Sequence, residues 1–119
     1  MASAVVQDEV YPPHTLRRPR NFLPWSKRNI VICDEEGWSL TFSGSTWRID
    51  CYEYLESGLE MVFGGEGATE QWDVFIPRRL SWQDSLNEEV DESTRVRILR
   101  RVTSAIQFMG YKVGFFQID

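Results

Sequence analysis

Five short segments between residues 29 and 77 alternate large apolar with polar residues, and this pattern limits what the chain can fold into more than any other feature. The clearest is residues 38–43, in which every second residue is large and apolar. A two-residue period places alternate side chains on opposite faces of a strand. Because turn residues separate the segments, at 34–37, 57–58 and 64–67, the sequence predicts an antiparallel meander of about five strands.

One helix is expected near the C-terminal end of the sequence. Apolar residues recur every three or four positions over residues 96–109, which is the period of an amphipathic helix, and Gly110 stands where helices commonly end. Either Asp91 or Ser93 can cap its start. Residues 111–118 are apolar on both faces and are predicted to form a buried final strand. The predicted fold class is therefore α+β, with one C-terminal amphipathic helix packed on an antiparallel meander and a final strand.

The N-terminal segment differs from the rest. Residues 1–28 have no sustained period and contain four prolines, which remove backbone donors and disfavour helices and central strands. We expect these residues to form a Pro-rich basic arm, followed by a single α+β domain at 29–119, since 119 residues suit one hydrophobic core. The arm has too many apolar side chains for a disordered tail, so part of it should lie along the domain, with Phe22–Trp25 as the expected anchor.

Signals for secretion or membrane insertion are not visible in the sequence. The first ten residues include Asp8 and Glu9 and have neither the basic region nor the apolar core of a signal peptide. The longest apolar runs, such as residues 30–33, are far shorter than the roughly 20 residues that cross a bilayer. We therefore expect a cytoplasmic protein with no membrane partner.

Charge is unevenly distributed along the chain. Residues 29–93 carry fifteen acidic and three basic side chains, whereas residues 1–28 carry five basic and two acidic, and residues 94–119 five basic and one acidic. The net charge of −5 hides this separation. The acidic middle segment either attracts a positively charged partner or pairs with the basic ends of the same chain, and the sequence leaves both open.

Residues that could carry catalysis or hold a metal are few. His14 is the only histidine and lies in the Pro-rich arm, a poor platform for a general base. Cys33 and Cys51 are too few for a zinc site, which needs about four Cys or His ligands, and are expected to be buried free thiols. We therefore predict no metal, no cofactor and no catalytic residue, although the many carboxylates leave an enzyme of unrecognised type as an alternative.

Residues Gly64–Gly67 form the one glycine-rich run in the sequence. A loop that cradles phosphate runs from a strand into a helix, and P-loop types add a lysine. Here no lysine follows, and residues 72–76 read as a strand. We therefore predict a mobile hairpin loop.

Two sets of residues are candidates for binding. Arg97, Arg100 and Arg101 are predicted on the polar face of the helix, where with the arginines of the arm they could bind phosphate. The overall pI of about 4.9 argues against nucleic acid as the partner. Binding of nucleic acid is therefore kept only as the alternative function. A strand face facing solvent, rich in tyrosine and acidic groups, is the preferred protein-binding surface. It is predicted to contain Arg48, Asp50, Tyr52, Tyr54, Glu56 and Glu60.

Residues 72–117 resemble a known family in their layout. An Ile76-Pro77 strand end, a Ser81-Trp82 connection, one amphipathic helix and a final Gly-Tyr-Lys-Val strand are similar to the pattern of small immunity proteins of bacterial polymorphic-toxin systems. The resemblance implies a non-enzymatic acidic protein that binds a cognate toxin and blocks it. It carries over no functional residue, because it is a matter of pattern rather than of a specific motif.

The leading prediction is therefore a non-enzymatic protein-binding module, with neutralisation of a basic toxin domain as its sharper form. The acidic middle segment is independently compatible with this role, because complementary charge speeds encounter and excludes wrong partners. The sequence does not fix the oligomeric state.

Overall fold

The computed structural model describes residues 11–21, 28–45, 48–67 and 70–118, with the side chains of Pro13 and residues 44–51 outside the description. Its elements, in chain order, are the 3-10 helix η1 (Pro13–Thr15), the strands β1 (Arg28–Cys33), β2 (Trp38–Ser45), β3 (Arg48–Glu56), β4 (Leu59–Gly67) and β5 (Gln71–Pro77), the helix α2 (Glu92–Phe108) and the strand β6 (Lys112–Ile118).

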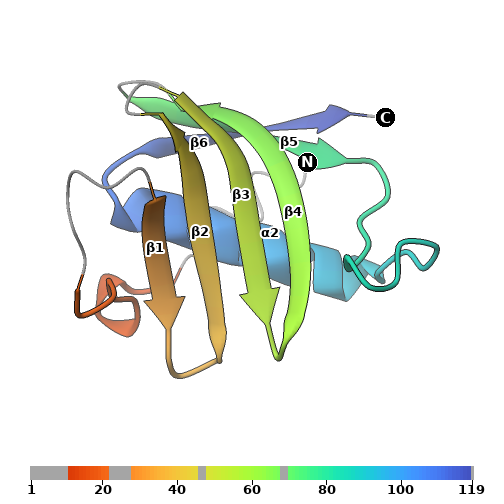
Figure 1. Ribbon diagram of the computed structural model, residues 1–119, viewed down its shortest axis with the longest axis horizontal. Coiled ribbons are helices and arrows are strands. Elements are labelled where there is room, and N and C mark those ends of the chain that lie inside the picture. The colour runs from red at the N-terminus through yellow and green to blue at the C-terminus, as the bar shows by residue number, and fades with distance from the viewer. Residues whose placement is uncertain (1–10, 22–27, 46–47, 68–69, 119) are drawn as a thin grey trace.

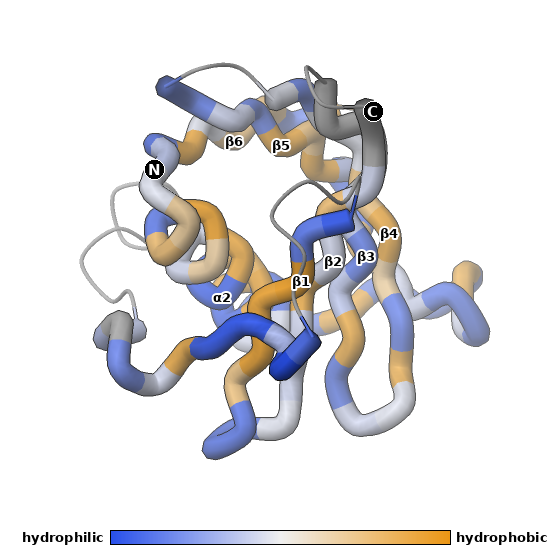
Figure 2. The backbone as a smooth tube through the Cα atoms, turned by 60° about the vertical axis from the view of Figure 1, so that its left-hand side comes forward, coloured by the Kyte–Doolittle hydropathy of each residue, from blue (hydrophilic) through white to orange (hydrophobic). Residues whose placement is uncertain are grey.

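The six strands form one sheet in the order β1-β2-β3-β4-β5-β6. The first five are antiparallel neighbours, which confirms the predicted meander. The last strand is parallel to β5, because α2 carries the chain back along the sheet before β6 begins. The sheet curves around α2, which lies across the inner side of β1–β4 (Figures 1 and 2). The predicted α+β class is confirmed.

The ends of α2 follow the local sequence signals. Asp91 is the N-cap, and its side chain accepts a hydrogen bond of 2.8 Å from the main-chain N–H of Thr94. Gly110, just beyond the helix, has a φ of +95°, which a residue with a Cβ rarely adopts. The predicted helix is therefore confirmed, with Asp91 rather than Ser93 as its cap.

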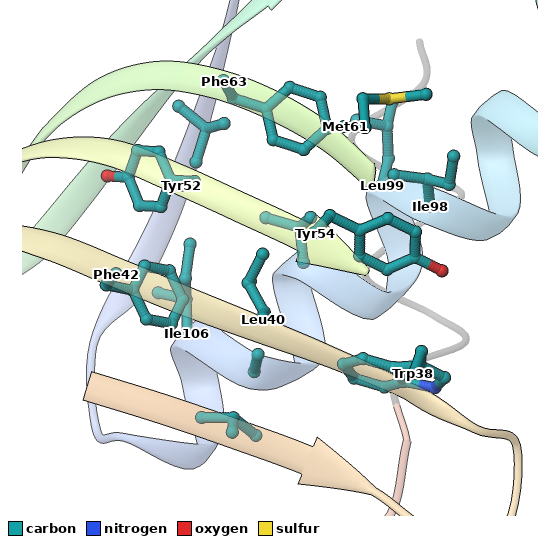
Figure 3. Close-up of a cluster of buried hydrophobic side chains, with 14 of the residues drawn as sticks. Trp38, Leu40, Phe42, Tyr52, Tyr54, Met61, Phe63, Ile98, Leu99 and Ile106 are labelled. Atoms are coloured by element: carbon teal, nitrogen blue, oxygen red, sulfur yellow. The ribbon is translucent and has the colours of Figure 1, made fainter. Parts of the chain in front are cut away.

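The core lies between the inner face of the sheet and α2. In β2 and β4 every second described side chain is buried. The alternation that predicted the strands therefore also places their apolar side chains in the core. Figure 3 shows how the aromatic and aliphatic side chains of the sheet meet those of the helix. The sheet and the helix contribute Trp38, Leu40, Phe42, Tyr52, Tyr54, Met61, Phe63, Trp72, Val74, Ile76, Ile98, Leu99, Val102, Ala105 and Ile106.

The predicted loop at Gly64–Gly67 is wrong, because these residues belong to β4 and pair with β5. At Gly65, a Cβ atom would lie 2.1 Å from Cε2 of Tyr52 and 2.3 Å from the main-chain oxygen of Asp73. The absence of a side chain at Gly65 therefore allows the buried Tyr52 ring to pack against the main chain of β4. Glycine inside a strand often marks such a close approach.

Part of the N-terminal segment packs on the domain, as predicted. Leu16 is buried in the core, and Arg17 exchanges two main-chain hydrogen bonds of 2.9 Å with Ile32 of β1. Arg17 thereby covers part of the outer edge of β1. The expected anchor at Phe22–Trp25 lies outside the described residues.

The final strand is not buried as predicted. It forms an edge of the sheet, and Phe116 and Ile118 are 50% and 46% exposed. Only one face of the strand meets the core, through Val113 and Phe115. An apolar run on both faces indicates burial only where both faces are covered, and here the outer face of β6 meets solvent.

Candidate protein-binding surface

The predicted exposure of Tyr52 and Tyr54 is wrong, since both side chains are fully buried. In the sheet, Tyr52 lies opposite Phe42 and Tyr54 opposite Leu40, and cross-strand partners share a face. Figure 3 shows the two tyrosine rings in the same layer of side chains as Phe42 and Leu40. These tyrosines therefore belong to the core and cannot contact a partner without unfolding it.

A bulge in β3 explains the error. The register between β2 and β3 shifts at Ser43 and Gly44, which pair with Cys51 and Ile49 and leave Asp50 as an extra residue. One extra residue reverses the alternation of the strand beyond it. Alternation counted from Ile49 predicts that Tyr52 and Tyr54 point to solvent. The extra residue lies between Ile49 and the tyrosines, so both tyrosines point to the core instead.

The remaining residues of that predicted face separate in the structure. Arg48 and Asp50 lie in β3, but their side chains are outside the described part of the chain. Glu56 is on the inner face at the end of β3, and its side chain is only 13% exposed. Glu60 is exposed in β4. Of the predicted residues with described side chains, Glu60 alone lies on the solvent side of the sheet.

Glu56 belongs to a buried ionic cluster around Arg101, which we call the Arg101 cluster. Arg101 donates from Nη1 to the Tyr54 hydroxyl at 2.7 Å and forms an ion pair with Glu56. From Nη2 it donates to Oε1 of Glu36 at 2.7 Å, and its Nε donates to the Tyr11 hydroxyl at 3.1 Å. The N-terminal segment, the β1–β2 turn and the end of β3 therefore all meet the guanidinium group of Arg101 from α2.

The predicted phosphate-binding ridge on α2 is not formed. The side chain of Arg101 is only 6% exposed, because residue 101 lies three positions after Ile98 and thus on the buried face of the helix. Arg97 donates from Nη2 to Oε1 of Glu56 at 2.8 Å. Arg100 lies over the Tyr11 ring, 5.4 Å from its centroid. These arginines are engaged with the domain rather than presented together to solvent.

Opposing effects set the ionisation of the Arg101 cluster. Burial alone would raise the pKa of Glu56, but hydrogen bonds and positive charge from Arg97 and Arg101 outweigh it and hold that pKa below its usual 4.5. The hydrogen bond from Tyr11, with Arg101 beside it, lowers the pKa of Glu36. Burial raises the pKa of Tyr54, so its hydroxyl stays neutral. The cluster therefore holds two carboxylates against one buried arginine.

The lowered pKa of Glu56 predicts a loss of stability in acid. A carboxyl group with a lower pKa in the folded state stabilises above its unfolded pKa, and this contribution disappears as the pH falls through the folded value. We expect Glu56→Gln to lower the free energy of unfolding by about 1–3 kcal/mol at neutral pH. The difference between variant and wild type should shrink as the pH falls below the usual pKa of 4.5 and through the lowered pKa of Glu56, measured by urea denaturation. A constant difference across this range would contradict the prediction.

Most of the exposed large apolar side chains of the described residues lie on strands. Among the described residues, five large apolar side chains are exposed: Leu55, Val62, Leu86, Phe116 and Ile118. All but Leu86 lie on strands of the sheet. Such residues scattered singly need no explanation, whereas a group on one face marks a surface suited to binding.

Leu55 and Val62 lie side by side on β3 and β4, together with two acidic residues. Leu55 is opposite Glu60, and Val62 is opposite Glu53, so apolar and acidic side chains alternate over four neighbouring positions. Leu55 is 45% exposed and Val62 37%. The two-residue turn at Ser57–Gly58 holds the strands in this register, with φ values of +52° and +80°. We call Glu53, Leu55, Glu60 and Val62 the hairpin face.

A groove adjoins the hairpin face. It is open to solvent, with a volume of about 440 Å³, and its lining includes Ile30, Ile32, Ser39 and Leu55. In the sheet register, Ser39 is the partner of both Ile32 and Leu55. A small side chain between two large ones leaves room for an apolar group of a partner. The sequence signal for this groove was the serine in β2, but only the register identified its neighbours.

The structure offers no separate chemical centre in its described part. Among the described residues, no three His, Cys, Asp or Glu side chains lie close enough to hold a metal ion together. His14 is exposed in η1, and Cys33 is a buried free thiol, as predicted, while the side chain of Cys51 is outside the description. In the described part of the chain, no helix has both the length and the apolar character needed to span a membrane.

Comparison of the chain with protein-family models, with curated proteins and with solved structures finds no match. The functional argument therefore depends on the geometry of the chain itself.

Proposed function

We propose that the chain is a non-enzymatic protein-binding module and that the hairpin face, with the adjoining groove, binds the partner. The observation that carries this proposal is the alternation of Leu55 and Val62 with Glu53 and Glu60 on an exposed hairpin. Apolar groups supply most of the affinity of a protein interface, while charges around them set the rate of encounter and the choice of partner.

The partner fitted by this surface is basic and presents at least one apolar side chain. The β1–β2 turn beside the groove adds the exposed acidic residues Asp34 and Glu35, although Asp34 is paired with Arg17. A basic toxin domain neutralised by this chain is the sharper form of the proposal. Residues 29–93 contain fifteen acidic and three basic side chains, which is compatible with such a partner. Asp34, Glu36 and Glu56 pair with arginines from the basic ends of the chain, so the remaining acidic groups of this segment carry the argument.

Nucleic acid is a weaker candidate on the same geometry. A phosphate backbone needs several accessible Lys or Arg side chains. Arg97 and Arg101 are instead ion-paired with Glu56.

Leu55→Arg is expected to weaken partner capture by about tenfold or more, because it places a positive charge at the centre of a surface that attracts positive charge. The measurement is capture from cells of the natural source, with tagged wild type and variant, followed by binding of the purified partner. If the partner is a toxin, the wild type should protect cells that express it, and the variant should not.

Leu86→Arg is the matched control, since Leu86 is 65% exposed but lies in the connection between β5 and α2. It introduces the same charge elsewhere and should leave capture unchanged. Equal capture by wild type and Leu55→Arg, with both folded, would remove the hairpin face as the binding surface.

A further inference from the structure

The main chain of β6 has one side that meets β5 and one that does not. The N–H of Lys112 donates to Glu70 at 2.9 Å, and the carbonyl of Ile118 accepts from Arg78 at 2.8 Å. Main-chain groups of successive residues in a strand point to opposite sides. Because residues 112 and 118 point towards β5, the N–H and C=O groups of Val113, Phe115 and Gln117 point to the free edge.

These outward groups have no hydrogen-bond partner within the described part of the chain. The opposite edge of the sheet is different, since Arg17 bonds twice to Ile32 there. Natural proteins usually protect an exposed edge with charges, proline or a bulge. In β6 the central residues Val113–Gln117 contain none of the charged side chains or prolines that do this. An unprotected edge of this kind is a template for another strand.

We propose that β6 pairs in antiparallel fashion with β6 of a second copy of this chain, with the twofold axis at Phe115. This register places Phe115 opposite its own copy and Val113 opposite Gln117, so every outward main-chain group of the three residues gains a partner. The interface is then the same surface on both copies, as a closed twofold dimer requires.

Exposed apolar side chains of β6 also come together in the same register. Phe116, which is 50% exposed, comes opposite Gly114 of the second copy, where the space over the glycine is filled by Gln71, Asp73 and Phe116 of that copy. The two Phe116 rings therefore lie diagonally across the twofold axis on the same face of the paired strands. Phe116 makes an edge-to-face contact with Phe75, with ring centroids 6.3 Å apart.

Gln117→Pro is the sharpest test, because it removes an outward N–H while leaving the groups that face β5 in place. Sedimentation over about a hundredfold range of concentration should show wild type moving from the mass of one chain to twice that mass. The variant should dissociate at least about tenfold more readily. Gln117→Thr, which keeps the N–H, should behave as wild type.

Phe116→Glu gives a second route if the proline variant does not fold. It places two like charges beside the twofold axis at an exposed position, and should also abolish the dimer. Hydrogen exchange adds a site-specific result, since the amides of Val113 and Phe115 should become protected only as the concentration rises. A chain that stays monomeric throughout, whether its edge is open or covered by its own residues, overturns the proposal. So does a dimer that survives both variants.

Discussion

Gly65→Ala is expected to lower the free energy of unfolding by about 3 kcal/mol or more, because the structure has no room for the added methyl group. The new Cβ would lie 2.3 Å from the main-chain oxygen of Asp73, which cannot move without breaking the pairing of β4 with β5. It would also lie 2.1 Å from the Tyr52 ring, which is packed edge-on against Phe42 at 5.1 Å. The urea midpoint followed by tryptophan fluorescence measures this loss.

Gly64→Ala is the matched control at the neighbouring position. A Cβ there would meet only Cδ2 of Phe75, at an ordinary contact distance of 4.0 Å. Its effect should stay within about 1 kcal/mol and can be stabilising, because alanine restricts the unfolded chain. Equal losses for the two variants would show that flexibility, rather than the close approach of Tyr52, explains the glycine run.

The sequence predicts those features of the fold that depend on residues close to one another along the chain. The alternation in β2 predicted its inner and outer faces, and Asp91 and Gly110 marked the two ends of α2. Each of these signals acts over a few residues, so no knowledge of the tertiary structure was needed. For the same reason the order of the antiparallel strands could be predicted.

The binding surface could not be found in this way, because it depends on register across strands. The bulge at Asp50 reversed the faces of β3 and made Leu55, rather than Tyr54, the residue exposed to solvent. A bulge adds one residue without a strong sequence signal of its own. The groove likewise depends on register, because it is lined by Ser39 and by its two large partners, Ile32 and Leu55, from neighbouring strands.

The Arg101 cluster was missed for a different reason. Arginine is usually exposed, which favours the polar face of α2 for Arg101, but its spacing from Ile98 and Ala105 places it on the buried face. Its partners Glu36 and Glu56 come from the β1–β2 turn and the end of β3. Nothing in the sequence separation of these residues indicates that they meet.

Arg101→Met is expected to cost about 3 kcal/mol of stability, since it leaves the largely buried carboxylate of Glu56 without its closest positive charge. Arg79→Met is the control, because Arg79 pairs with Glu89 at the surface, where its side chain is 69% exposed. Loss of an exposed pair of this kind costs about 1 kcal/mol or less. Urea denaturation of both variants at neutral pH compares the two.

A second substitution separates lost packing from unpaired charge. In the Arg101→Met variant, Glu56 keeps its ion pair with Arg97 at 2.8 Å but loses the one with Arg101. If the cost of Arg101→Met comes from this partly unpaired carboxylate, then Glu56→Gln in the same chain should restore part of the stability. The coupling between the two positions should be about 1–3 kcal/mol in a double-mutant cycle. Additive losses would mean that Arg101 stabilises the chain through the packing of its stem and through Trp38, whose ring centroid lies 5.6 Å from the guanidinium carbon.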